Sequence, residues 1–485
     1  MPINLNNIKF ILLSYFIVII SFYSSVLTST YAFLDDFGTI ENALAGLDAP
    51  YVFDISSGRP LFALFRIIDG VITSGIEDLW MQRSFSVISL FALAVFINRF
   101  ITKIHLFNRD EYNFTFPLMI ALLPSFQVYS SWATCYPFTL AVLFSGLSYS
   151  CLTSSFFNKK LVRWLISWMF ICCSFAIYQP AGMAFMAFAL LDQCLSPKSV
   201  NYRVLFNSFV MMCSGMLSSL IMIKVVPLLA FGQTLSRSTM TDNPTGKIRW
   251  FFGEAIPNSL ANYSISASEP MLIIGLVFFC MGLAYIYSNK DGIKKVLFTL
   301  VFIAGSYFPN LYVSESWAAQ RSIVAMSICI VAVSLFSLMK FSDFLFTHFR
   351  IKGAGVLSVL LIASAGVTAT GNINNYMISN QISEIESVAS EISNKVDKSF
   401  SGAVMVDISK RNWGAFSRIV RYDEFGENSV YAPWAARGIL LTIKKSKGFS
   451  YSVPKNPVIS NSNNCSENCI TIQPNEAMLK STLNY

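Results

Sequence analysis

Charged residues are scarce in this sequence. Asp, Glu, Lys and Arg make up 13% of its 485 residues, about half of the share that a soluble globular protein carries. Hydrophobic residues make up 54%, and the mean hydropathy is +0.54. This balance argues against an ordinary soluble domain and predicts a protein that crosses a membrane several times.

Several motifs of soluble and metal-dependent enzymes are also missing. The sequence has no G-x-x-x-x-G-K-[ST] phosphate loop, no G-x-S-x-G elbow and no H-E-x-x-H motif. Its only histidines are His105 and His348, so a zinc site is not expected. The net charge of +8 comes from short Lys and Arg clusters between apolar runs, and no basic face indicates nucleic acid. An ATP-driven pump and a zinc protease are therefore poorly supported.

Apolar runs of membrane length are what the sequence has instead. A helix needs about 20 predominantly apolar residues to cross a bilayer. Roughly eleven such runs are present, at residues 9–31, 79–98, 114–130, 135–157, 161–178, 180–195, 204–232, 270–288, 295–313, 322–340 and 353–371. We therefore expect an all-α polytopic membrane protein with about 11 transmembrane helices.

Lys and Arg alternate along the connections between these runs. Every even-numbered connection is basic, whereas the short odd connections at 125–134 and 178–181 contain no Lys or Arg. The positive-inside rule places the basic connections in the cytoplasm. The N-terminus is then cytoplasmic, and the loops at 32–78 and 233–269 and the C-terminal tail face outward, into the periplasm for a bacterial inner membrane.

The composition becomes soluble after Gly371, which predicts a transmembrane module at 1–371 and an outer domain at 372–485. Helical spacing of apolar residues predicts an amphipathic helix from about residue 373 to about residue 397. Segments 402–407 and 438–443 have the composition of strands, so we expect a small α/β domain. Cys465 and Cys469 form a C-x3-C pair in the polar tail, either a short-loop disulfide or two free thiols.

Adjacent carboxylates, Asp35 and Asp36, directly follow the first apolar run. At the water interface they avoid a burial cost on the order of a few kcal/mol each. One of them can accept a proton from a hydroxyl, while the other raises its basicity or holds a sugar hydroxyl. The alternative is a helix N-cap with a solvated neighbour.

A transferase that uses a lipid-linked donor also needs cationic groups for the departing phosphate. Arg59, in the turn at 57–60, is the first candidate, and the alternative is a partner for Asp54. The other candidates for substrate binding are Glu41, Arg66, Lys224, Arg249 and Arg321.

Simpler structural roles compete with these assignments. Lys224 is placed to snorkel to the interface, and Arg321 to form a salt bridge with Glu315. Residues 61–68 suit a short interfacial helix with Arg66 and Asp69 on its wetter side.

Residues 33–38 (FLDDFG) and 57–61 (SGRPL) carry a resemblance to a known family. With the layout of the whole chain, they resemble the membrane-integral glycosyltransferases of the GT-C superfold. More narrowly, they are similar to the GtrII-like serotype-converting O-antigen glucosyltransferases. The resemblance implies transfer of glucose from undecaprenyl-phosphate glucose to a sugar of the lipid-linked O-antigen repeat, on the periplasmic face, by single displacement with inversion.

The resemblance also implies roles for residues and partners. An acid of the first outer loop is the general base, and by position this is Asp35, with Asp36 assisting. A separate flippase and a separate enzyme that makes the lipid-linked glucose are the implied partners, within the lipids of the inner membrane. The resemblance implies no certain cofactor and leaves a divalent metal open.

Two other functions stay as alternatives. An O-antigen polymerase is also polytopic and also has large outer loops. A lipid-linked saccharide flippase or transporter would place polar residues at the bilayer midplane and often has repeated halves. Here the mid-span positions are almost uniformly apolar and no repeat is evident, so the transporter ranks last.

Overall fold

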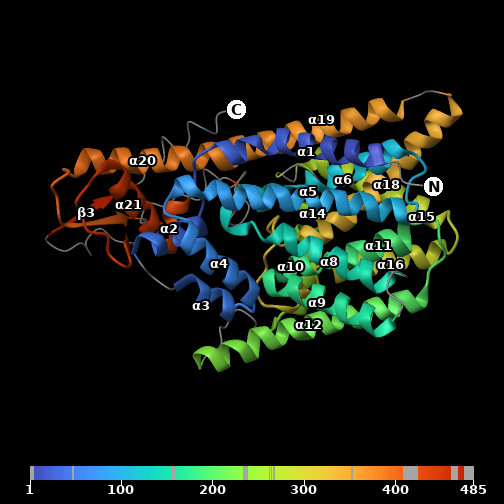
Figure 1. Cartoon of the computed structure of the whole chain (residues 1–485), viewed down its shortest axis with the longest axis horizontal. Coiled ribbons are helices and arrows are strands. Elements are labelled where there is room, and N and C mark those ends of the chain that lie inside the picture. Colours follow the sequence, from blue (N-terminus) through green and yellow to red (C-terminus); the bar gives the residue numbers. More distant parts are fainter. Residues whose placement is uncertain are drawn as a thin grey trace.

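We analysed a computed structural model of the whole chain (Figure 1). The structure describes residues 5–45, 49–154, 159–232, 239–261, 263, 265, 268–350, 353–407, 424, 425, 427–459 and 468–473. Within these ranges the chain is mostly helical, with a small parallel sheet near the C-terminus.

Eight helical stretches of the described residues are long and apolar enough to cross a membrane. Their helices are α1 (Leu5–Thr28), α5 (Trp80–Lys103), α8 (Phe138–Thr153), α9 (Lys160–Ile177), α12 (Tyr202–Phe231), α15 (Glu269–Tyr287), α18 (Val324–His348) and α19 (Ala354–Asn372). This is the architecture of a polytopic membrane protein, as the composition predicts.

The three remaining apolar runs form interrupted helices. They comprise α6 (Asp110–Ala121) with α7 (Pro124–Ser131), α10 (Gln179–Gly182) with α11 (Phe185–Leu190) and the π-helix η3 (Leu191–Leu195), and α16 (Gly292–Gly305) with α17 (Phe308–Tyr312). Prolines occupy the first turns of α7, α10 and α17, where a missing backbone N–H breaks no helical hydrogen bond. The number of membrane crossings therefore stays a prediction.

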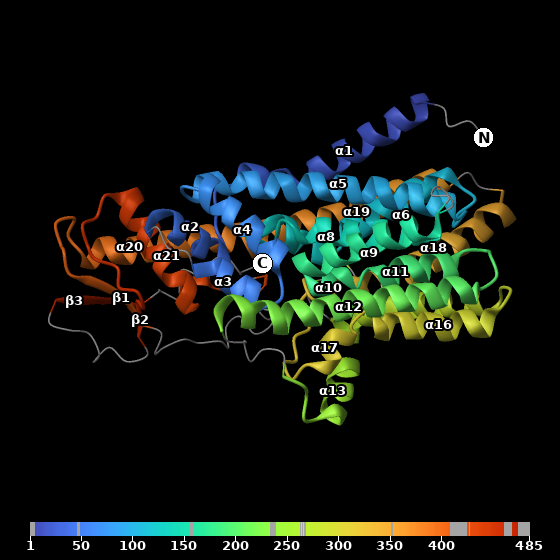
Figure 2. The same ribbon diagram turned by 60° about the horizontal axis from the view of Figure 1, so that its bottom comes forward.

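The long helices run side by side along the long axis of the molecule (Figures 1 and 2). The small sheet and the short helices of the first polar loop gather at one end, and the N-terminus lies toward the other. Helix α5 ends with Lys103, α9 begins with Lys160 and α16 carries Lys294 in its first turn. We call the end that these three residues mark the basic end.

The first polar loop contains α2 (Asp35–Ala45), α3 (Ala49–Ser56), α4 (Pro60–Ile72) and the 3-10 helix η1 (Ile76–Leu79). The predicted helix at 61–68 is present as α4, but its predicted orientation is wrong. The side chain of Arg66 is 7% exposed and Asp69 is 2% exposed, whereas Val71 is 83% exposed. The polar side of α4 packs inward and an apolar side faces out, because its charged residues have partners inside the protein.

The loop at 233–269 folds partly into α13 (Pro244–Trp250), the π-helix η5 (Phe251–Ala255) and α14 (Ile256–Leu260). Met240 forms an antiparallel bridge with Val313, which ties this loop to the end of α17. Lys247 is buried, and its ammonium donates to the carbonyl oxygens of Asn310 and Glu315. The described part of the loop from residue 239 to Lys247 thus packs against the 308–315 segment.

The C-terminal part begins as a continuation of the last long helix. Helix α19 runs through the π-helix η6 (Ile373–Ile378) into α20 (Ser379–Lys395), which confirms the predicted amphipathic helix. The predicted strand at 402–407 is confirmed as β1 (Ala403–Asp407). Strands β2 (Val458–Ile459) and β3 (Cys469–Ile472) pair with it in parallel, in the order β2-β1-β3.

The predicted strand at 438–443 is wrong, because these residues lie in α21 (Pro433–Lys447). Pro433 occupies the first turn, Gly448 follows the last residue with a φ of 69°, and three lysines occupy the last turn. These are the ordinary signals of a helix start and a helix end. Helix α21 packs against α2, and the 3-10 helix η8 (Ser429–Tyr431) precedes it.

Gly438 makes this packing close. A Cβ atom at Gly438 would lie 2.3 Å from the carbonyl oxygen of Phe37 in α2. We expect Gly438→Ala to lower the free energy of unfolding by about 1–3 kcal/mol, because α21 would have to move away from α2. Thermal unfolding of the purified protein in detergent measures this change.

Gly371→Ala is the matched control, since Gly371 is also helical and a Cβ there would meet nothing within 4 Å. It should leave the unfolding temperature unchanged or raise it, because Ala is a better helix former by about 1 kcal/mol. Equal unfolding temperatures for Gly438→Ala and the wild type would contradict the close packing of α21 on α2.

Candidate active site

The acidic pair begins helix α2. Phe33 donates its backbone N–H to Oδ2 of Asp36 at 3.1 Å, and the backbone N–H of Asp36 donates back to the Phe33 carbonyl at 2.9 Å. This reciprocal pattern resembles a capping box and satisfies backbone groups at the start of the helix. Leu34 has a φ of 42°, a strained value for a residue with a side chain. Its N–H donates to Oγ of Ser429, at 3.0 Å.

The carboxylate of Asp36 is fully buried and accepts hydrogen bonds at both oxygens. Oδ1 accepts from the backbone N–H and from the hydroxyl of Thr134, each at 2.7 Å, and Oδ2 accepts from Phe33. Burial raises the pKa of Asp36, and the charge of Arg83 and the bonds from Thr134 and Phe33 oppose this rise. The hydrogen bonds of Asp36 therefore stabilise the local structure at the start of α2.

Arg83 supplies the compensating charge from α5. Its side chain is fully buried, its guanidinium lies 3.6 Å from the centroid of the Tyr31 ring, and Nη2 donates to the Tyr31 carbonyl at 2.5 Å. Arg83 is not among the residues predicted for the site from the sequence. The available signal was its position inside the second apolar run, where a charged residue usually has a specific partner.

Arg66 extends the same buried network from α4. Nη1 donates to the Thr134 hydroxyl at 2.9 Å, and Nε lies 3.7 Å from Oδ2 of Asp54 in an ion pair. Asp54 and Asp69 are themselves buried. Burial raises the pKa of each from 3.8 to about 6, although the charge of Arg66 opposes the rise in both. Arg66 thus lies within the protein and not at an open surface.

Asp35 has a different environment from its neighbour. It is partly exposed, and Oδ1 accepts a hydrogen bond from Nε1 of Trp434 in α21, at 2.9 Å. Among the described residues, no other hydrogen bond reaches the Asp35 carboxylate. One oxygen of Asp35 can therefore accept a proton or a hydrogen bond from a ligand.

Arg321 lies close to Asp35. Its guanidinium lies 4.7 Å from the centroid of the Trp132 ring. Burial would lower the pKa of Arg321, but interactions with four ionisable groups, Tyr178, Cys135, Glu424 and Asp35, outweigh burial and raise this pKa. The predicted salt bridge between Arg321 and Glu315 is wrong, because the described residues form no ion pair between these two side chains.

Glu424, from the C-terminal part, fixes the backbone beneath Arg321. This carboxylate is fully buried and accepts the backbone N–H groups of Gln320 and Arg321, each at 2.6 Å. The Tyr129 hydroxyl donates to the Arg321 carbonyl at 2.7 Å. No local pattern in the sequence marked Glu424, because its partners lie more than a hundred residues away.

Arg59 also interacts with Tyr178, the residue whose pKa Arg321 affects. Its guanidinium is 4.9 Å from the centroid of the Tyr178 ring, and its Nε donates to Gln179 at 3.1 Å. Gln179 in turn donates to the carbonyl oxygens of Ser57 and Gly58, at 3.0 and 3.2 Å. These contacts hold the turn at 57–60, where Gly58 has a φ of 75°.

Tyr178 is affected by both arginines. Burial raises the pKa of its hydroxyl to about 12, against the opposing charges of Arg321 and Arg59. The hydroxyl therefore stays protonated at neutral pH and can donate a hydrogen bond. Asp35, Arg321, Tyr178 and Arg59 thus combine an acceptor, two cations and a donor in one region.

The other predicted residues lie elsewhere. Glu41 forms an ion pair with Arg437 and so ties α2 to α21. Lys224 lies exposed on α12, one residue after Ile223, which packs against Gly58. Arg249 is exposed on α13. Of these three, Lys224 is the one whose neighbour in the chain touches the turn that carries Arg59.

The described residues contain no group of three or more His, Cys, Asp or Glu side chains placed to hold a metal. A role for a divalent metal stays untested. Cys469 is disulfide-bonded, and Cys465 lies outside the described residues. Comparison of the chain with models of known protein families and with curated proteins gave no match.

The raised pKa values of Asp54 and Asp69 predict a pH dependence of stability. Each acid binds its proton more tightly in the folded protein than in the unfolded chain, so stability falls as pH rises from about 4 to about 6. The ceiling for each is about 3 kcal/mol, from a rise of about two pKa units at about 1.4 kcal/mol each. Asp54→Asn should flatten this fall, measured as unfolding temperature against pH in detergent.

Asp78→Asn provides a control of opposite sign. Asp78 accepts from the N–H and the hydroxyl of Ser74, which lower its pKa. It therefore contributes stability that is lost only as pH falls below about 4, so its removal should leave the fall of stability between pH 4 and pH 6 unchanged. A wild-type protein whose stability rises between pH 4 and pH 6 would contradict the assignment for Asp54 and Asp69.

Proposed function

We propose that this protein is a membrane glucosyltransferase. It transfers glucose from undecaprenyl-phosphate glucose to a sugar of the lipid-linked O-antigen repeat, on the periplasmic face. The observation that carries the proposal is Asp35. One oxygen of its carboxylate accepts from Trp434, the other accepts no hydrogen bond from the described residues, and its charge interacts with that of Arg321. A base next to fixed cationic groups suits displacement of a phosphate leaving group by a hydroxyl.

The reaction is a single displacement. Asp35 accepts the proton of the acceptor hydroxyl, and the hydroxyl oxygen forms a bond to the anomeric carbon of glucose. The bond from that carbon to the phosphate oxygen breaks on the opposite face, which inverts the anomeric configuration. Arg321 and Arg59 balance the charge on the departing undecaprenyl phosphate, and the Tyr178 hydroxyl can donate to it.

The surface around the turn at 57–60 suits a lipid-linked donor. Arg59 directly precedes α4, whose Leu64, Ile67 and Val71 are 51%, 48% and 83% exposed. An outward apolar helix face of this kind lies against acyl chains in a membrane. The phosphate of a polyprenyl donor would then reach Arg59 while its chain stays in the lipid.

The proposed orientation follows from the distribution of charge. The basic end faces the cytoplasm under the positive-inside rule, so the N-terminus is cytoplasmic and Asp35 and the C-terminal part are periplasmic. Nucleotide sugars and ATP are then unsuitable donors, because they are cytoplasmic. A separate flippase and a separate enzyme that makes the donor complete the proposed pathway.

The two acids have separate roles in this proposal. Asp35→Asn removes the base, and we expect glucosylation of the O-antigen to fall at least 100-fold while the protein still accumulates and folds. Sugar-linkage analysis of O-antigen from cells with each variant measures the loss. Asp397→Asn, at an exposed acid of the C-terminal part, is the matched control and should keep full activity.

Asp36→Asn should instead destabilise the protein. The backbone N–H groups of Phe33 and Thr134 each donate to one carboxylate oxygen of Asp36. An amide has only one acceptor oxygen, so one of these buried N–H groups would face an NH2 group and lose its hydrogen bond, at a cost of about 1–3 kcal/mol in folding free energy. A lower unfolding temperature in detergent checks this.

Full glucosylation by Asp35→Asn would overturn the proposed site. Collapse of the O-antigen ladder in cells without the protein would favour a polymerase.

Arg321→Lys tests the cation next to the base. Lys keeps a positive charge but loses the planar guanidinium that stacks on Trp132 and binds phosphate in a fork. We expect glucosylation to fall by about 100-fold, the range seen when one transition-state donor is lost. Arg203→Lys, at an exposed arginine of the basic end, should show no loss, and equal activity of the two variants would exclude Arg321 from the reaction.

A further inference from the structure

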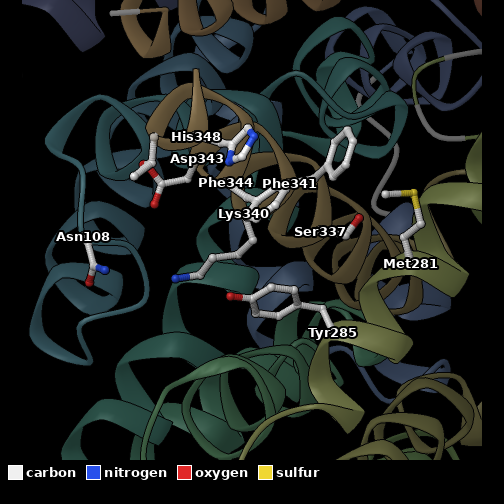
Figure 3. A pocket seen from close by; sticks show the side chains of 10 residues that line it. Asn108, Met281, Tyr285, Ser337, Lys340, Phe341, Asp343, Phe344 and His348 are labelled. Carbon is white, nitrogen blue, oxygen red and sulfur yellow. The ribbon is translucent and has the colours of Figure 1, made fainter. Parts of the chain in front are cut away.

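A cavity of about 580 Å³ opens at the basic end of the bundle (Figure 3). It lies between α15, α18 and the turn before α6, far along the molecule from Asp35. Its polar lining includes Asn108, Tyr285, Lys340, Asp343 and His348. None of these residues takes part in the site around Asp35, so the cavity needs its own explanation.

The cavity holds a cation with unused hydrogen-bond donors. The Lys340 ammonium and the Tyr285 hydroxyl both point toward the side of the cavity where Asn108 lies (Figure 3). Within the described ranges, Lys340 makes no hydrogen bond or ion pair, and its closest aromatic contact is the Phe336 ring at 5.6 Å. An ammonium carries three donors, and a phosphate group offers matching acceptors and charge.

The acid in the cavity wall, Asp343, interacts with two cations and is ion-paired with only one of them. Asp343 forms an ion pair and a hydrogen bond with Arg109, the residue after Asn108. The His348 ring stacks on Phe344, with ring centroids 6.0 Å apart. One carboxylate, that of Asp343, thus faces two cations, Arg109 and Lys340, so the wall keeps a net positive charge and the cavity favours an anion.

The apolar rim of the cavity indicates that this anion carries hydrocarbon chains. Phe341 and Phe344 line the cavity and are 45% and 63% exposed. On α15, Leu276 and Val277 are also about half exposed, at 49% and 51%, on a helix of membrane length. A free phosphate would leave these side chains uncovered, whereas a phospholipid at the membrane surface covers them with its acyl chains.

We propose that this cavity binds the headgroup of an anionic glycerophospholipid. Lys340 and Tyr285 donate hydrogen bonds to its phosphate, and its chains lie along Phe341 and Phe344. This site is separate from the proposed sugar transfer and does not depend on it. Basic pockets between transmembrane helices at the membrane surface are suited to such headgroups.

The test measures lipid binding to the purified full-length protein in detergent. Phosphatidylglycerol, phosphatidylcholine and inorganic phosphate are titrated separately, and bound lipid is detected by native mass spectrometry. We expect the wild type to prefer phosphatidylglycerol, and Lys340→Gln to weaken its binding about tenfold through loss of a charge-assisted bond. Tyr285→Phe, which keeps the ring, should weaken it by about threefold.

Lys290→Gln is the matched control, because Lys290 is an exposed lysine between α15 and α16 at the same end. It should bind phosphatidylglycerol as the wild type does, and circular dichroism shows whether each variant is folded. If Lys340→Gln does not fold, Tyr285→Phe decides the result. The proposal is overturned if the folded cavity variants bind phosphatidylglycerol as the wild type does, or if Lys290→Gln loses as much binding as they do. It is also overturned if the wild type binds phosphatidylcholine equally well, or binds inorganic phosphate in place of lipid.

Discussion

The buried carboxylate of Asp36 joins three parts of the chain that are distant in sequence. It accepts hydrogen bonds from Phe33 and Thr134, and its charge is balanced by Arg83 of α5. In a low-dielectric interior a buried charge is tolerated only when it is paired and fully hydrogen-bonded. The connection after α1, the start of α5 and the segment before α8 therefore have to meet in one arrangement.

Asp35 owes its position to this arrangement. Because neighbouring side chains at the start of a helix point in different directions, burying Asp36 leaves Asp35 partly exposed. The strained backbone of Leu34, which directly precedes Asp35, is held by the hydrogen bond to Ser429. Strain of this kind persists only where the surrounding structure over-determines the conformation, which here includes the C-terminal part.

The C-terminal part contributes side chains to the candidate site. Ser429, Trp434 and Arg437 contact the acidic loop, and Glu424 holds the backbone at Arg321. The α19–α20 helix runs without a break from an apolar to a polar composition. The change in composition near Gly371 marks the end of the apolar span within this continuous helix.

The sequence alone was sufficient for features that depend on local composition. Membrane-length helices, the helix at 373–395 and strand β1 follow from apolar length and periodicity. The placement of Asp35 and Asp36 at a helix start was also predictable, because acids favour the first turn. The short apolar segment at 438–443 was not, since helix and strand share such a pattern and only the flanking Pro and Gly distinguish them.

The tertiary structure decided what each polar residue does. Arg66 is an internal partner of Asp54, Glu41 pairs with Arg437, and Glu424 and Arg83 enter the site without any local motif. In the acidic pair, Asp36 is a buried carboxylate with hydrogen bonds at both oxygens, whereas Asp35 is partly exposed and accepts one hydrogen bond, from Trp434. Charge pairing and burial join residues that are far apart in the sequence. The role of each polar residue therefore depends on which segments pack together, and residue spacing alone does not determine that packing.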